Sequence, residues 1–150
     1  MGSTSSIRIL LVDGHPKFIG ALRELMDAEY GFCVVGEASG GRHAVEQATT
    51  LEPDVTLVDV STQMPHGLCA MRRLSHNSKV IVLSLDPQEW LLFPVLAAGA
   101  RGFVSKTNVD LDLVRAIKTV VRGDVFLDRD GTRLLRQWSK STANDAANLM

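Results

Sequence analysis

The stretch IRILLVD, residues 7–13, is a short run of Ile, Leu and Val that ends directly in a carboxylate. Four later runs have the same character, at residues 33–38, 55–60, 80–83 and 102–105. Most of them are continuously apolar rather than alternating, which is typical of parallel strands buried on both faces. The opening stretch therefore predicts the first strand of a parallel sheet.

Amphipathic segments separate these runs. Apolar stripes at helical spacing follow Pro16 and the Gly40-Gly41 turn, and another lies at residues 68–74. The fourth predicted helix, at residues 88–98, is apolar nearly all round and contains Pro94, which is expected to kink or end it. The fifth predicted helix has its stripe at Leu111, Val114, Ile117 and Val121. Strands that alternate with helices predict an α/β fold, with a five-stranded parallel sheet in the order 2-1-3-4-5.

The ends of the chain differ from this repeating pattern. Residues 1–6 are read as a disordered, Ser-rich leader, and residues 7–127 as the one domain that 150 residues predict. Residues 125–127 look extended, and residues 133–138 predict one or two helical turns. The segment 128–150 is interpreted as a linker or C-terminal tail.

Composition excludes several classes of function. Sixteen Lys and Arg against seventeen Asp and Glu leave a net charge of −1, which argues against direct nucleic-acid binding by this chain. The longest apolar stretch, residues 90–100, is too short to span a membrane. Two cysteines, Cys33 and Cys69, are too few for a disulfide framework, so a cytoplasmic location is expected.

Reactive side chains cluster at the predicted strand ends. Asp13 and Asp59 end the first and third strands, which are neighbours in the predicted order, while Ser84 and Lys106 follow the fourth and fifth. An aspartate nucleophile, a second carboxylate for a divalent cation, a hydroxyl donor and a lysine are the groups needed to phosphorylate an aspartate. The pattern predicts such a site at one rim of the sheet.

Five segments together resemble the receiver domains of bacterial response regulators, in particular the NarL/FixJ-like branch. They are Ile9–Asp13 with His15-Pro16, Val34–Ala38, Pro53–Asp59, Val80–Ser84, and Ala98–Phe103 followed by Lys106. The resemblance implies a three-layer, flavodoxin-like (βα)5 receiver fold. It also implies a role in two-component signalling and transcription regulation, with a LuxR-type DNA-binding domain after this chain.

The resemblance implies a role for each site residue. Asp59 would be the phosphoacceptor, with Asp13 and the backbone carbonyl of Ser61 assisting Mg²⁺. Lys106 and Ser84 would contact the phosphoryl group, and Ser84 with Phe103 would form the switch pair.

The acid pocket departs from the family pattern. Gly14 stands where the family has a second acid, and Met64-Pro65 comes two residues later than the usual Met-Pro. Mg²⁺ binding is therefore expected to be weak or absent, and phosphorylation of Asp59 likewise. Metal ligation by His15 or His66 is less favoured than a solvated or capping role.

Partners follow from the same interpretation. A histidine kinase is a candidate phosphodonor, and the apolar residues Trp90, Phe93 and Leu96 are candidate contacts for a homodimer or for the output domain.

The chain is expected not to be an enzyme. One alternative is a receiver module that works without phosphorylation by binding a ligand or protein. The other is a small flavodoxin-like enzyme or nucleotide binder, disfavoured because no GxGxxG or GxxxxGK motif follows the first strand.

Overall fold

The five predicted strands form one parallel sheet, and a sixth strand extends it. The computed structural model describes residues 6–59, 66–85 and 89–149. The strands are β1 (Ile7–Val12), β2 (Phe32–Ala38), β3 (Val55–Asp59), β4 (Lys79–Ser84), β5 (Gly102–Ser105) and β6 (Phe126–Leu127). Their order, β2-β1-β3-β4-β5-β6, confirms the predicted order of the first five strands, and two residues of the extended piece predicted at 125–127 form the sixth strand, at the edge.

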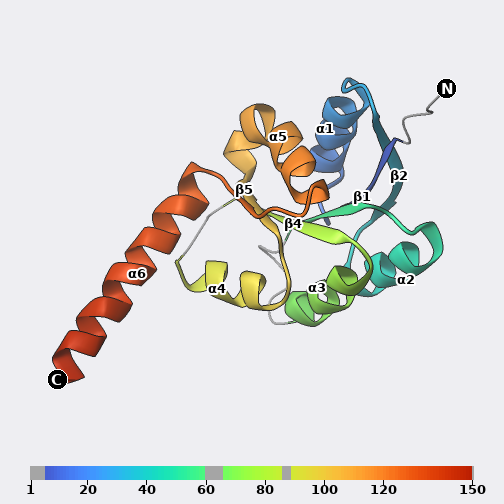
Figure 1. The fold of residues 1–150 in the computed structure, drawn as a ribbon. Coiled ribbons are helices and arrows are strands. Elements are labelled where there is room, and N and C mark those ends of the chain that lie inside the picture. Colours follow the sequence, from blue (N-terminus) through green and yellow to red (C-terminus); the bar gives the residue numbers. More distant parts are fainter. Residues whose placement is uncertain (1–5, 60–65, 86–88, 150) are drawn as a thin grey trace.

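Helices cover both faces of this sheet, so the fold has three layers (Figure 1). α1 and α5 lie on one face, and α2, α3 and α4 on the other (Figure 1). The bounds are α1 (Pro16–Asp27), α2 (Gly41–Leu51), α3 (His66–Asn77), α4 (Glu89–Ala97), α5 (Val109–Val121) and α6 (Arg129–Leu149). A 3-10 turn at Lys106–Asn108 joins β5 to α5.

Alternate residues of β1 enter two separate cores. Ile9 and Leu11 pack with α1 and α5, whereas Leu10 and Val12 pack with the helices of the opposite face. All four are buried. Continuous apolar runs are needed because a central parallel strand buries both of its faces.

The stripe predicted for the fifth helix is correct at Ile117, which is buried, and in part at Val114, which packs against the core, but it is wrong at its two ends. Leu111 is 83% exposed and Val121 is also exposed, whereas Leu113, Ala116, Ile117 and Val120 are buried. Both sets satisfy helical spacing.

The C-terminal segment is more helical than the sequence predicts. Instead of one or two turns, α6 runs through Arg129–Leu149, and its distal half extends away from the rest of the molecule (Figure 1). Its first turns pack against β5 and α4. In the described ranges, no helix combines the length and apolar character needed to cross a membrane.

Candidate functional site

Two buried carboxylates meet at the carboxyl ends of neighbouring strands. Asp13 directly follows β1, and Asp59 is the last residue of β3, which pairs with β1 in parallel. Both are less than 10% exposed. The backbone N–H of Asp13 donates to the Ala38 carbonyl at 3.0 Å, which holds the start of this loop against β2. Strand order therefore brings together two residues that lie far apart in the sequence.

Lys106 lies between these two carboxylates. Its Nζ is 3.0 Å from Asp13 Oδ2 and 3.1 Å from Asp59 Oδ2, and its side chain is only 8% exposed. The ammonium group also lies 4.3 Å from the centroid of the Phe18 ring, a cation–π distance. One ammonium group faces two carboxylates, so an excess of negative charge remains at this rim.

His15 lies at the rim of the pocket, with a side chain that is largely exposed. Its backbone N–H donates to Asp13 Oδ1 at 2.8 Å, and its ring Nδ1 lies 2.8 Å from the same oxygen. Nδ1 is also 3.7 Å from Asp59 Oδ2. The His15 side chain is 58% exposed, so the ring forms the outer wall of the pocket.

The donor set fits a divalent cation only in part. One ligand atom each from Asp13, His15 and Asp59 can be chosen so that all lie within 4.8 Å of one another. Mg²⁺ prefers oxygen ligands and is often held by one or two carboxylates with several waters. Asp13 and Asp59 are therefore the side chains that would hold it. Ser61, the expected backbone ligand, lies outside the described residues, as does the Met64-Pro65 loop.

Gly14 leaves open space beside the carboxylates. A Cβ on Gly14 would approach nothing closer than the Ser39 carbonyl oxygen, at 3.7 Å. The same residue lines a cavity of about 330 Å³ together with Asp13, Glu37 and His43. A Cβ at position 14 would therefore make only ordinary van der Waals contact with the described structure.

Ser84 and Phe103 are fully buried on the two strands next to the pocket. Among the described residues, Ser84 Oγ has no hydrogen-bond partner. A buried hydroxyl without a partner is unfavourable, which suits a group that donates to a bound ligand. Phe103 packs in the core shared with α4 and α6. Their role as a switch pair stays a prediction.

The predicted interface on α4 is partly covered by the chain itself. The rings of Phe93 and Trp138 of α6 have centroids 4.0 Å apart. Leu92 and Val95 are buried, and Leu96 is partly buried. The Trp90 side chain lies outside the described part of the structure. The sequence did not predict this covering, because the apolar pattern of α4 is the same whether a helix of the same chain or a second protein packs against it.

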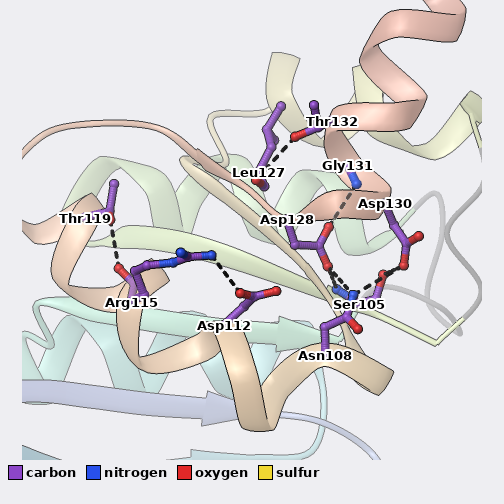
Figure 2. Close-up of polar contacts among 10 residues, drawn as sticks. All are labelled: Ser105, Asn108, Asp112, Arg115, Thr119, Leu127, Asp128, Asp130, Gly131 and Thr132. Atoms are coloured by element: carbon purple, nitrogen blue, oxygen red, sulfur yellow. Dashed lines mark hydrogen bonds and ion pairs between the residues drawn. The ribbon is translucent and has the colours of Figure 1, made fainter.

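A group of polar residues at the start of α6 was not predicted from the sequence. Asp128 and Asp130 accept hydrogen bonds from Ser105 and Asn108, which lie on either side of Lys106 and Thr107 (Figure 2). The available signal was Asp128, a favourable N-cap residue directly before a helical pattern.

Comparisons with known proteins agree with this geometry. A family model described as the response regulator receiver domain matches residues 9–118. The chain is 35% identical to the response regulator UvrY of Escherichia coli (strain K12) over 127 residues, which is 83% of this chain and 58% of UvrY. It is 30% identical to the nitrate/nitrite response regulator protein NarL of the same strain, covering 90% of this chain and 64% of NarL.

Solved structures give the same result. A two-component response regulator of the LuxR family from Aurantimonas sp. SI85-9A1 superposes with a TM-score of 0.83 at 25% identity, covering 90% of this chain and 99% of that one. The RcsB–DNA complex, at 22% identity and a TM-score of 0.77, supports the fold alone; the match covers 88% of this chain and 68% of RcsB. These similarities confirm the resemblance carried by the strand-end motifs.

Proposed function

The chain belongs to the family of response regulator receiver domains, and we propose that Asp59 is its phosphoacceptor, with weak phosphorylation. The observation that carries this proposal is the position of Lys106 Nζ, about equally close to the buried carboxylates of Asp13 and Asp59. A cation held there can contact the oxygens of a phosphoryl group that arrives at Asp59.

Each residue would have a defined part in phosphoryl transfer. A carboxylate oxygen of Asp59 forms the new bond to phosphorus while the bond from phosphorus to the donor's leaving group breaks. Lys106 balances charge on the phosphoryl oxygens, and the Ser84 hydroxyl donates to one of them. Mg²⁺, held by Asp13 and Asp59, would supply further charge neutralisation. Gly14 provides no carboxylate to strengthen that site, which is why transfer is weak.

Phosphorylation can be tested directly by intact mass spectrometry. We expect acetyl phosphate with Mg²⁺ to add one phosphoryl group slowly to the wild-type chain and none to Asp59→Asn. Fragmentation should place the group on Asp59. No added mass after prolonged incubation, with a known receiver domain phosphorylated in parallel, would contradict the proposal.

The replacement Gly14→Asp should strengthen Mg²⁺ binding. We expect wild-type affinity on the order of millimolar or weaker and an improvement of about tenfold in the variant, because affinity rises with the number of charged oxygen ligands. Gly20→Asp is a matched control, since Gly20 lies on α1 and a Cβ there would meet nothing within 4 Å. Isothermal titration calorimetry measures both. Equal affinity in Gly14→Asp and wild type would show that residue 14 does not limit the site.

The biological role proposed for the whole protein follows from its relatives. The chain spans about 58% to 65% of the length of the curated relatives that it matches. We infer that it is the cytoplasmic regulatory module of a transcription regulator, not an enzyme, and that residues 128–150 lead to a DNA-binding output domain. A histidine kinase would supply the phosphoryl group, and a homodimer would be one form of the active state.

A receiver that works without phosphorylation is the second candidate. Gly14 favours it, because this position offers no carboxylate to strengthen a cation site beside Asp13 and Asp59. In that case the pocket would be a structural ion-pair cluster, and a ligand or protein would bias the domain. Failure of the mass-spectrometry test would favour this candidate.

A further inference from the structure

Ser105 connects the acid pocket to the beginning of α6. Its backbone N–H donates to Asp128 Oδ2 and its Oγ donates to Asp130 Oδ2, each at 2.7 Å (Figure 2). Ser105 is buried, and the next residue along the chain is Lys106. The same short segment therefore bonds to the pocket carboxylates on one side and to α6 on the other.

Asn108 completes this cluster, which we call the α6 clasp: Ser105, Asn108, Asp128 and Asp130. Asn108 Nδ2 donates to Asp128 Oδ2 at 3.1 Å and to Asp130 Oδ2 at 3.4 Å. Asp128 is 2% exposed, and its Oδ1 accepts the Gly131 N–H at 2.8 Å (Figure 2). Asp128 thus caps α6 while its other oxygen holds the β5–α5 loop.

Beyond the clasp, α6 makes close apolar contacts. A Cβ on Gly131 would lie 3.1 Å from the Phe103 ring, so the helix backbone passes unusually near that side chain. One turn later, Leu134 is buried in the core that contains Leu92 and Phe103. Trp138 then stacks on Phe93 of α4. Movement of the clasp would therefore change how α6 lies on α4.

We propose that the α6 clasp couples the acid pocket to α6, so that a change at Lys106 loosens or tightens the hold of α6 on α4. A shift of Lys106 moves the backbone of Ser105, and with it the donor groups that bind Asp128 and Asp130. This coupling deepens the proposed function. It rests on the proposed function only in that the phosphoryl group on Asp59 is taken as the natural input. The coupling itself is a property of the fold and can be measured without phosphate.

A double-mutant cycle read by hydrogen–deuterium exchange tests the coupling. The variants are Ser105→Ala, Lys106→Gln and the combination, and the readout is the exchange rate of amides 131–138 relative to those of α2. Exchange in α2, which packs beside β2 and α3, reports on the global stability of the domain. Dividing by the α2 rates therefore removes the effect of any global destabilisation on the α6 rates. Ser105→Ala should raise α6 exchange by about tenfold or more, since it removes a hydrogen bond to a charged group. Asp124→Asn, in an exposed loop, should leave it unchanged.

Non-additivity is the decisive result. We expect Lys106→Gln to raise the relative exchange rate of α6 in the wild-type background. In the Ser105→Ala background the fold increase caused by Lys106→Gln should be smaller, by at least about threefold. The proposal is overturned if the product of the two single-variant effects on the α6 exchange rate equals the effect of the double variant to within about twofold. If Ser105→Ala does not fold, Asp130→Asn takes its place, because Asp130 is partly exposed and its replacement keeps the side-chain shape.

The outcome is distinguishable from failure of the proposed function. If no phosphoryl group is added to Asp59 but the cycle is non-additive, the clasp stands and the phosphoacceptor proposal fails. If Asp59 is phosphorylated but the cycle is additive, the clasp is wrong. Where both hold, phosphorylation should change α6 exchange in the wild type and change it less in Ser105→Ala.

Discussion

Replacing Lys106 with methionine should lower the free energy of unfolding by about 3 kcal/mol, because removal of one partner leaves buried charges uncompensated. Lys106 Nζ is the cation within 3.1 Å of both Asp13 and Asp59. Methionine retains most of the side-chain length, so little packing is lost against Phe18. Urea denaturation followed by circular dichroism measures the change.

A surface lysine supplies the control for this experiment. Lys118 pairs with Glu29 at 3.1 Å, but its side chain is 53% exposed. Lys118→Met should cost less than about 1 kcal/mol, as expected for an exposed ion pair. Adding Asp59→Asn to Lys106→Met should recover part of the lost stability, because it removes one of the two buried negative charges. Equal losses in the two lysine variants would show that the pocket carboxylates do not depend on Lys106.

Leu134→Ala should also destabilise the domain strongly, by about 2 to 5 kcal/mol, the range for a buried leucine truncated to alanine. Leu134 is 2% exposed and lies in the core that also contains Leu92 of α4 and Phe103 of β5. The adjacent Leu135 is 37% exposed, which makes Leu135→Ala a control of identical chemistry. That control should change stability by less than about 1 kcal/mol.

The two leucine variants show whether the C-terminal segment folds together with the rest of the domain. A large difference between Leu134→Ala and Leu135→Ala means that the first turns of α6 belong to the cooperative folding unit. Similar small effects would mean that residues 128–150 behave as the linker or tail predicted from the sequence. The measurement is the midpoint and slope of denaturant unfolding, since loss of a separately folding helix would leave both nearly unchanged.

Much of the candidate site was predictable because it depends on strand order. Asp13 and Asp59 follow apolar runs, and parallel neighbours place their carboxyl ends at the same rim. The same reasoning brought Lys106 there. The close contact between the His15 ring and Asp13 was not predicted, because the path of a loop after a strand depends on backbone hydrogen bonds such as that from His15 to Asp13.

Which face of a helix is buried was less predictable than where the helix lies in the sequence. The fifth helix was expected where it occurs, yet its buried stripe is Leu113, Ala116, Ile117 and Val120. A segment rich in Leu, Ile and Val offers more than one apolar stripe at helical spacing. Only tertiary packing against the sheet selects between them.

The sequence by itself determined the parallel sheet and its order, because apolar runs that alternate with helices suit few other arrangements. It also indicated the family, through the resemblance of its strand-end motifs to those of receiver domains. Tertiary structure alone decided how far α6 extends and what covers α4. Residues 139–144 are exposed and show no strong apolar pattern, so local sequence gives little reason to expect a helix there. Long-range contacts anchor its start: Asp128 caps the helix and bonds to Ser105, and Trp138 stacks on Phe93. Such contacts supply the free energy that helix propensity lacks, and no local pattern reports them.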